Sequence, residues 1–588
     1  MDLPEETKHK IYQAHFVRGT KPDEYKVIYR NFYELIEYRA HLQPDDVYIV
    51  FYPDEGERVE LTYAQFKDKV FRTANLLRQN EIGLEDRVAT VSHNHLNTAI
   101  QYFAAWSIGA TVVPINVNEE PERIKYILKS SNAKLAFVKH DYFELIQSIM
   151  DDLPNLQKLL VHGLVEKQFN PVPEEIEIFE EVLPTQRNTL EPDQSVNQAT
   201  EALIVYTSGT TGLPKGVVLT QNNLLVDADG IAKWHGMEKG QVMMCVLPIH
   251  HVNGTVVTMI TPMYYGGRTV LNQRFHTHTF FKRLAHENVQ VASVVPTLLQ
   301  FLCHDFETST PVKDTFREYD QQFTKSFRHI ICGAGPLTCE LVLKFEDMFK
   351  LKIVHGYGLS ETTCYSCFLP IDLDYDEHTK LLRDYGFPSI GSEIEPNEMD
   401  IQDSHGNHVS EGERGEIVIR GHNVMKYYDQ NPEANASTFE FGWFRSGDEG
   451  FYRTDEKGRK FFFITGRIKE LIIRGGTNIA PLEIDEVLMG IACIKAGIAV
   501  GFDNEWYGEE VGALVQLKED ALNTAPDEKL KQEILTICRS KLPFYKAPKV
   551  IIFSDTIPVT STGKYQRNKV KHLFEKYRSV QFREVQPK

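Results

Sequence analysis

YTSGTTGLPKGVVLT, residues 206 to 220, alternates hydroxyl and glycine residues and then turns at a proline toward Lys215. Backbone N–H groups and hydroxyls in such a run can curl around an anion, and glycine allows the close approach. Lys215 adds a mobile positive charge. A Walker P-loop has glycine directly before its lysine, whereas Pro214 stands there in this chain. The stretch therefore predicts a phosphate-binding loop of another kind.

Five further motifs follow in order along the chain, and with the phosphate loop they resemble the adenylate-forming superfamily. That superfamily includes acyl-CoA synthetases, aryl-CoA ligases, luciferases and the adenylation domains of peptide synthetases. The resemblance runs from about Leu61 to Arg567. The five motifs are Gly333-Ala334-Gly335-Pro336-Leu337, Gly356-Tyr357-Gly358-Leu359-Ser360-Glu361-Thr362, Gly442-Trp443-Phe444-Arg445-Ser446-Gly447-Asp448, Thr465-Gly466-Arg467-Ile468-Lys469-Glu470 and Ser561-Thr562-Gly563-Lys564-Tyr565-Gln566-Arg567.

The composition is that of a soluble globular protein with more than one domain. The chain has 588 residues, of which 42% are hydrophobic and 25% charged, so it exceeds one ordinary core. A formal net charge of −18 argues against a nucleic-acid partner, which requires basic patches. The start, MDLPEETKHK, lacks the apolar core of a signal peptide, and we find no apolar run long enough to cross a bilayer. We expect a cytoplasmic protein.

Eight cysteines in so long a chain do not indicate a disulfide scaffold. Cys364 and Cys367 form a C-x-x-C pair, which is compatible with zinc or redox chemistry. No second pair lies nearby, and the segment directly follows the Gly356–Thr362 motif. We therefore expect reduced thiols that line or back a pocket.

Helical and strand periods alternate from Leu61 onward, which predicts parallel sheets covered by helices. Apolar residues at positions 66, 70, 74 and 77 share one helical face. The stretches 166–197 and 304–324 lack a sustained period, and we expect the first to be a loop or insertion. Predicted strands span 87–91, 111–113 and 134–138, and predicted helices surround 98–108 and 119–129.

The clearest boundary falls within 466–472 and divides an α/β chain into two expected domains. Residues 1–468 would form a large N-terminal domain with the ATP and acyl pockets. Residues 469–588 would form a small, mobile α+β domain that carries the lysine loop, of ordinary domain size. Its predicted helices span 479–489 and 528–541, and its predicted strands span 496–501 and 512–517.

The resemblance implies how ATP would be held. The phosphate loop would hold the β- and γ-phosphates, Glu361 would bind Mg²⁺, and Tyr357 would stack on adenine opposite the turn at 333–336. Asp448 would accept hydrogen bonds from the ribose, and Arg467 would contact ribose or phosphate. Ser360 stands where the family usually has threonine and keeps the hydroxyl. The implied ATP-binding residues are Thr207, Ser208, Gly209, Thr210, Thr211, Lys215, Gly333, Ala334, Gly335, Pro336, Tyr357, Gly358, Ser360, Asp448 and Arg467.

Two further features carry the implied chemistry, a lysine in a C-terminal loop and the acyl-pocket motif. Lys564, in a glycine-flanked loop, would bring its ammonium to the charge that develops between the carboxylate and the α-phosphate. Residues 248–254, PIHHVNG, resemble the acyl-pocket motif; His251 aligns with the family histidine near the carboxylate, and His250 replaces the usual aromatic residue. Two adjacent histidines also suggest a metal, but no third ligand is evident.

A hinge is implied at Lys469. The C-terminal domain would swing between an adenylating pose, with Lys564 inserted, and a thioester-forming pose. In the second pose the Arg474-Gly475-Gly476 loop would line the thiol tunnel, because paired glycines let the backbone pass close to a narrow ligand arm.

The resulting hypothesis is an acid–thiol ligase, an acyl-CoA synthetase that uses ATP, Mg²⁺ and CoA. It would convert a carboxylic acid to acyl-AMP and pass the acyl group to the CoA thiol. An enzyme that loads a carrier-protein phosphopantetheine arm is the main alternative. A silent nucleotide-binding relative and a luciferase-type oxygenase are weaker alternatives, because the key charged residues are present and nothing selects a luciferin. The sequence assigns neither the acid nor the oligomeric state.

Overall fold

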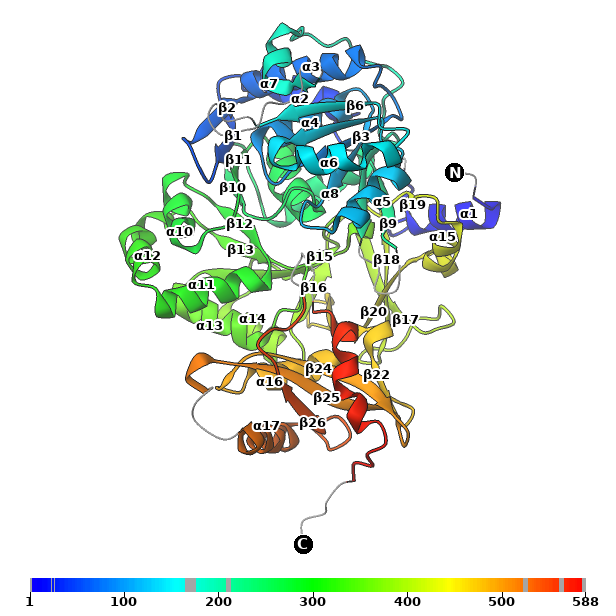
Figure 1. Cartoon of the computed structure of the whole chain (residues 1–588), viewed down its shortest axis with the longest axis vertical. Helices are drawn as coiled ribbons and strands as arrows, with labels where there is room; N and C mark the ends of the chain where they lie inside the picture. Colours follow the sequence, from blue (N-terminus) through cyan, green and yellow to red (C-terminus); the bar gives the residue numbers. More distant parts are fainter. Residues whose placement is uncertain are drawn as a thin grey trace.

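The computed structural model describes residues 3–22, 24–25, 27–163, 176–207, 213–521, 527–559 and 565–583. The strands of these residues form three sheets, of thirteen, eight and five strands. In Figure 1 the C-terminal unit, coloured orange to red, lies at one end of the larger part of the molecule. The mixed α/β architecture confirms the predicted fold class.

The eight-stranded sheet contains the three strands predicted before the phosphate loop. They pair in parallel, and helices α3 (Tyr63–Gln79), α4 (Leu96–Ser107) and α5 (Pro121–Ser131) connect or cover them. The predicted face of α3 is buried. The sheet order is β19 (Tyr427–Tyr428), β9 (Lys215–Thr220), β8 (Glu201–Thr207), β4 (Thr111–Ile115), β3 (Arg87–Val91), β5 (Leu135–Lys139), β6 (Lys158–His162) and β7 (Glu177–Ile178).

The thirteen-stranded sheet changes character along its length. Its parallel segment is almost fully buried, as expected for strands covered on both faces, and an antiparallel segment continues it. The order is β17 (Asn397–Gln402), β18 (Gly415–Gly421), β20 (Phe444–Thr454), β21 (Lys460–Arg467), β16 (Ser389–Glu393), β15 (Cys367–Phe368), β14 (Lys352–Tyr357), β13 (His329–Cys332), β12 (Val291–Val294), β10 (Val242–Cys245), β11 (Arg268–Asn272), β1 (Val47–Tyr52) and β2 (Val59–Thr62).

The remaining helices of the large part precede, cover or connect these two sheets. They are α1 (Glu5–Ala14), α2 (Phe32–Leu42), α6 (Phe143–Ile149), α7 (Phe179–Val182), α8 (Gln221–Trp234), α9 (Thr261–Tyr265), α10 (Thr277–His286), α11 (Pro296–Thr308), α12 (Thr310–Phe323), α13 (Cys339–Phe349), α14 (Tyr375–Arg383) and α15 (Pro432–Thr438), with η4 (Asn253–Ile260), a π-helix.

The stretch 304–324 corrects the sequence analysis, because it is helical rather than irregular. It contains the end of α11 and all of α12. Phe316 and Phe323 of α12 pack on Phe281, with ring centroids 4.9 and 5.7 Å apart. The charged residues of α12 lie on the exposed side, so the high charge density concealed an amphipathic helix.

The stretch 166–197 is only partly an irregular loop. Residues 164–175 lie outside the described part of the chain. Beyond them, β7 adds a parallel strand to β6 and α7 follows at once. Phe179 of α7 is completely buried, and Val182 and Leu183, three and four residues later, pack on the same core. So short a helical repeat in an acidic, proline-containing stretch was not recognised in the sequence.

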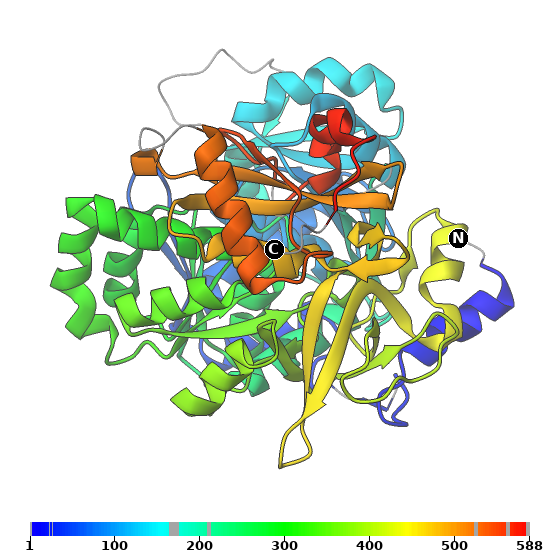
Figure 2. The same ribbon diagram turned by 90° about the horizontal axis from the view of Figure 1, so that it is seen from below.

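The C-terminal unit has a sheet and a core of its own. The order is β23 (Thr477–Ile479), β22 (Ile472–Arg474), β25 (Gly508–Leu517) and β24 (Ile494–Asn504), with β26 (Val550–Phe553) paired to β25. The predicted helices are α16 (Pro481–Met489) and α17 (Asp527–Lys541). A separate apolar cluster runs from Ile472 to Ile551, and Figure 2 shows the unit lying across the larger part.

No described helix is both long and apolar enough to pass through a lipid bilayer.

Candidate active site

The phosphate stretch is a hairpin connection between two antiparallel strands. β8 ends at Thr207 and β9 begins at Lys215, and these two residues are register partners. Thr207 and Lys215 are both partly buried. Of the other predicted phosphate ligands, Ser208, Gly209, Thr210 and Thr211 lie outside the described residues. The hairpin differs from the strand–loop–helix arrangement of a Walker loop, in agreement with Pro214 before the lysine.

Glu361 lies beside the phosphate hairpin, in the short 3-10 turn η5 (Ser360–Thr362). Its Oε1 accepts a hydrogen bond of 2.8 Å from the hydroxyl of Tyr428. The ammonium of Lys215 lies 4.8 Å from the centroid of the Tyr428 ring. Burial, and then the Glu361 carboxylate, raise the pKa of Tyr428 well above its usual value, so the phenol stays protonated and donates. Three segments distant in sequence thus meet around one carboxylate.

Tyr428 was not predicted from the sequence. It belongs to β19, which pairs with β9 and so comes alongside Lys215. Between β18 and β19 the chain forms a connection, residues 422–426, which we call the strand-linking loop. The Met425 N–H of this loop donates to the backbone oxygen of Glu361 at 2.7 Å. In the sequence only the pair Tyr427-Tyr428 could have pointed to this residue, because its contacts depend on the pairing of strands that are distant in sequence.

A second cluster forms around Asp448 on β20. Its Oδ2 accepts a 2.6 Å hydrogen bond from the Tyr357 hydroxyl, and its Oδ1 lies 2.9 Å from Nε of Arg467. Asp448 and Arg467 are register partners on β20 and β21. The Asp448 carboxylate raises the pKa of Arg467, whereas burial, and then Asp448, raise that of Tyr357. The predicted ribose and adenine residues therefore form one hydrogen-bonded group.

Two glycine turns lie at one edge of the large sheet. Gly333 follows β13 and Gly358 follows β14, and these strands are parallel neighbours, so both turns leave the carboxyl ends of their strands, where ligands of open α/β sheets bind. Ala334 has φ +65°, a conformation that costs a non-glycine residue free energy and is concentrated at functional sites. Gly335 and Pro336 complete the first turn and Ser360 begins η5 after the second.

The acyl-pocket motif leads directly into the π-helix η4. His250 is buried and its ring centroid lies 4.3 Å from that of His251. Neither ring nitrogen of His250 has a hydrogen-bond partner among the described residues, and burial lowers its pKa well below the usual value, so the ring is neutral. π-helical turns occur often at functional sites.

A network of buried, hydrogen-bonded polar side chains begins at Asn253, two residues after His251. Asn253 of η4 donates from Nδ2 to the Tyr365 hydroxyl at 3.0 Å, and its Oδ1 accepts from the Ser293 hydroxyl at 2.7 Å. The Tyr365 ring packs against Gly333 and Gly356, where a Cβ would come within 2.8 Å of it. Tyr365 is 2% exposed. Hydrogen-bonded polar side chains therefore form the wall between the histidines and the two glycine turns.

The predicted hinge residue and the two predicted tunnel glycines lie on exposed turns, whereas Arg474 ends β22 with its side chain largely buried. Lys469 is exposed in the 3-10 turn η7 (Ile468–Glu470). Gly475 and Gly476 have φ of +56° and +83° and connect β22 to β23. Arg474 is anchored by Glu510, whose Oε1 lies 2.7 Å from Arg474 Nε. A cavity of about 470 Å³ adjoins this hairpin and is lined by Arg474, Tyr507, Pro543, Phe544, Tyr545 and Phe582.

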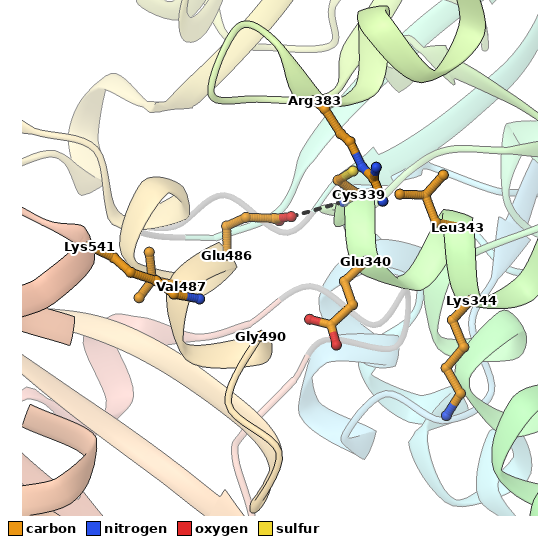
Figure 3. Close-up of a pocket in the computed structure, with 9 residues that line it drawn as sticks. All are labelled: Cys339, Glu340, Leu343, Lys344, Arg383, Glu486, Val487, Gly490 and Lys541. Atoms are coloured by element: carbon orange, nitrogen blue, oxygen red, sulfur yellow. Dashed lines mark hydrogen bonds between the residues drawn. The ribbon is translucent and has the colours of Figure 1, made fainter. Parts of the chain in front are cut away.

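The C-terminal unit contacts the larger part through Glu486 of α16. Figure 3 shows Glu486 pointing across to α13, where its Oε1 accepts a 3.0 Å hydrogen bond from the Cys339 N–H. α13 begins two residues after Leu337, the last residue of the first glycine turn. Burial raises the pKa of Glu486 to about 7. A cavity of about 460 Å³ at this boundary is lined by Cys339, Glu340, Leu343, Lys344, Arg383, Glu486, Val487, Gly490 and Lys541.

Lys564, the predicted catalytic lysine, lies outside the described residues. On either side of this loop, Tyr565 and Val559 form an isolated bridge. Arg567 is buried and pairs with Asp485 of α16, which anchors the loop base to the C-terminal unit. Cys364 and Cys367 are both free thiols and buried. Among the described residues no group of three or more His, Cys, Asp or Glu side chains is arranged to hold a metal.

Comparison with family models gives two consecutive matches. The model described as AMP-binding enzyme matches residues 36–429, and the model described as AMP-binding enzyme C-terminal domain matches residues 483–564. The first match alone covers more than half of the 588 residues.

Curated proteins and solved structures give matches over nearly the whole chain. A sulfoacetate–CoA ligase of Cupriavidus necator is 30% identical over 537 residues, 91% of this chain and 96% of the relative. An oxalate–CoA ligase of Arabidopsis thaliana is 29% identical, over 88% of this chain and 95% of the relative. The crystal structure of an anthranilate CoA ligase with anthranoyl-AMP has a TM-score of 0.79 at 22% identity, covering 94% of this chain and 98% of that one, and so shares the fold.

Proposed function

The chain belongs to the AMP-binding enzyme family of the adenylate-forming superfamily and is an AMP-forming CoA ligase; on that premise we propose which residues carry each half of its reaction. In the first half a carboxylate oxygen of the acid attacks the α-phosphorus of ATP, and pyrophosphate leaves. In the second half the CoA thiol attacks the acyl-AMP carbonyl, the thiol proton is released and AMP leaves. The single observation that carries the assignment is the meeting of Lys215, Tyr428 and Glu361.

The first half-reaction needs the triphosphate held at one end and the nucleoside at the other. The hairpin with Thr207, Ser208, Gly209, Thr210, Thr211 and Lys215 would hold the leaving phosphates. Asp448, Arg467 and Tyr357 would hold the nucleoside, with the turn of Gly333, Ala334, Gly335 and Pro336, and Gly358 and Ser360, beside it. Lys564 would stabilise the charge at the α-phosphorus.

The donor set at Glu361 fits Mg²⁺. Glu361 offers oxygen ligands only, and Tyr428 orients one of its two oxygens, leaving the other for a cation. Mg²⁺ prefers one or two protein carboxylates together with substrate phosphates. When bound it would neutralise part of the phosphate charge, while Lys215 and Glu361 fix the geometry on the protein side. His251 would border the reacting carboxylate on the acyl side.

The second half-reaction would use a different face of the C-terminal unit. We place the domain boundary between residues 468 and 469, with a large domain of residues 1–468 and a small, mobile domain of residues 469–588. The separate apolar core that begins at Ile472 supports this division. Rotation about Lys469 would bring Arg474, Gly475 and Gly476 to the site.

We infer that the acid is short and polar. Asn253, Tyr365 and Ser293 fill the wall behind His251 with hydrogen-bonded side chains, and His250 stands in the acyl-pocket motif. A wall of this kind offers hydrogen-bonding groups to a polar acid and little apolar surface to a long chain. Relatives named for sulfoacetate and oxalate support this class of substrate.

We propose a cytoplasmic enzyme with free CoA as its acceptor. A carrier-protein phosphopantetheine is the competing acceptor, since both present the same thiol. The relatives named as CoA ligases support CoA.

Glu361→Gln tests the assignment of the metal end. It keeps the shape and removes the charge, so pyrophosphate release at low Mg²⁺ should fall by about tenfold or more, and added Mg²⁺ should restore part of it. Pyrophosphate release is measured over a Mg²⁺ titration, with the exposed Glu377→Gln as control. A Mg²⁺ titration of Glu361→Gln that overlays the wild type would exclude Glu361 as a ligand.

An acid screen tests the substrate class. Pyrophosphate release is measured with and without CoA for short polar acids, aromatic acids and long fatty acids. Short polar acids should give the highest kcat/KM. Tyr365→Phe should reduce the difference in kcat/KM between short polar acids and the other acids, because it removes one hydroxyl from the wall. Preference for a long fatty acid would contradict the inference. Thioester formation with a carrier protein and not with CoA would favour the competing acceptor.

A further inference from the structure

The N-terminal segment, residues 3–31, contacts both ends of the nucleotide site from outside. The described part of this segment contains α1 and precedes the region matched by the AMP-binding enzyme model, which starts at residue 36. In both views the blue helix α1 lies beside the yellow segment that holds α15 (Figures 1 and 2). We call residues 3–31 the N-terminal arm.

One contact of the arm reaches the strand-linking loop. Nε2 of His15 lies 3.0 Å from the Val424 oxygen and 3.2 Å from the Met425 oxygen. Because both partners are carbonyl oxygens, Nε2 must carry the proton and donate. Burial lowers the pKa of His15, so the ring is neutral and keeps one donor in a fixed place. His15 therefore holds two successive carbonyls of this loop.

The same loop residues continue into the metal end of the site. The N–H of Met425 donates to the Glu361 backbone oxygen at 2.7 Å, and the loop leads to Tyr428, whose hydroxyl binds the Glu361 carboxylate. Thr363, just beyond η5, donates to the Asn423 oxygen at 2.6 Å. The Val424 oxygen that His15 holds and the Met425 N–H that holds Glu361 belong to the same peptide group.

Other arm residues fix the loop from the same side. Tyr25 stacks on His422 with ring centroids 4.7 Å apart, and its hydroxyl donates to Asp229 of α8. At the other end of the site, Gly442 begins the motif that carries Asp448, and a Cβ at Gly442 would collide with the Gln13 side chain. These contacts of the arm thus reach the strand-linking loop, α8 and the start of the motif that carries Asp448.

We propose that His15 is a positioning residue for the cation and phosphate end of the site, acting through Met425 and Tyr428 on Glu361. This inference rests on the proposed role of Glu361. Without the imidazole, the Met425 carbonyl loses this donor while the Val424 carbonyl keeps the Asn223 Nδ2 donor at 2.9 Å, so the Tyr428 hydroxyl and the Glu361 carboxylate are held less rigidly. The consequence is weaker binding of the cation with the triphosphate, while the acyl and thiol ends of the site are unaffected.

The test compares His15→Ala with His9→Ala, which removes an exposed histidine from α1, the helix that ends directly before His15. Calorimetry measures Mg²⁺-dependent binding of α,β-methylene-ATP, and hydrogen exchange follows the peptide that contains residues 421–428. His15→Ala should weaken the Mg²⁺-dependent binding about tenfold and speed exchange in that peptide. His15→Gln, which retains an N–H donor, should recover part of both, and His9→Ala should match the wild type.

Three outcomes are separable in the same experiment. If His15→Ala binds Mg²⁺ and the analogue like the wild type while Glu361→Gln does not, the positioning role is wrong and the proposed function stands. If neither variant changes the Mg²⁺ dependence, the assignment of Glu361 fails and the positioning role falls with it. Equal loss of thermal stability and of analogue binding without Mg²⁺ would show a general structural role and overturn the inference, with His15→Gln distinguishing misfolding from lost donation.

Discussion

The C-terminal unit has two faces with different chemistry. On the docked face, the carboxylate of Glu486 receives the N–H of Cys339 across the boundary, and charged side chains of both parts surround the cavity. On the hairpin face, the chain at Arg474 adjoins a cavity lined by aromatic rings. Large apolar side chains stay exposed on the C-terminal unit: Ile473 is 53%, Trp506 57% and Tyr545 40% exposed.

This difference indicates that the present arrangement pairs polar groups of the docked face and leaves large apolar side chains of the C-terminal unit exposed. Polar groups at the docked boundary find partners, whereas exposed apolar surface of this kind usually marks a contact made elsewhere. The hairpin face also carries the paired glycines. We therefore expect the two faces to serve different half-reactions, and three changes test that expectation.

The largest effect is expected for Lys564→Ala. Loss of one preorganised charge should slow acyl-AMP formation on the order of 10²- to 10³-fold. Thioester formation from supplied acyl-AMP should persist, because Lys564 would act only when the docked face is engaged. Pyrophosphate exchange and CoA-thioester formation are measured side by side, with the exposed Lys529→Ala as control. Normal exchange in Lys564→Ala would remove this residue from the first half-reaction.

An intermediate effect is expected for Lys469→Pro. Proline fixes φ near −65°, a value that suits the 3-10 turn at Lys469 in the present arrangement. Single-turnover pyrophosphate release should therefore change little. Thioester formation should fall by about tenfold or more, because the C-terminal unit could no longer rotate its hairpin face to the active site. Lys469→Ala serves as control for the lost charge. Equal loss in both half-reactions would mean that the pivot lies elsewhere or that folding is damaged.

The smallest effect is expected for Glu486→Gln and depends on pH. The pKa of Glu486 is raised to about 7 in the docked arrangement, mainly by burial, and it returns toward the usual value near 4.5 when the face is released. Its contribution to docking is therefore fully present below about 4.5 and is lost as pH rises through 7. Thioester formation from supplied acyl-AMP should rise a few-fold between pH 5 and 8 in the wild type.

Glu486→Gln imitates the protonated carboxyl and should flatten that rise. Glu340, Asp485, Arg383, Lys344 and Lys541 are the other charged groups near this boundary, so Glu340→Gln is the matched control. An unchanged pH profile in Glu486→Gln would assign the pH dependence to another group.

Much of the fold follows from local patterns in the sequence. The predicted strand at 87–91 and the helices of the C-terminal unit are present because their apolar residues repeat at the strand or helix period within a few positions. No helix was predicted for the stretch 304–324, since its few aromatic anchors are widely spaced among charges. The separate core beyond Ile472 is consistent with the predicted boundary, which stays a prediction, as do the roles of the site residues.

The sequence by itself determined the family, because each motif is a contiguous run whose residue types suffice to show the resemblance. Only the tertiary structure decided which residues meet. Tyr428 reaches Glu361 across 67 positions, Tyr357 reaches Asp448 across 91, and His15 reaches Val424 across 409. Such contacts depend on strand pairing and on the packing of the chain around two sheets, and no local period encodes either. The partners that hold the motif residues in place therefore become visible only in the folded chain.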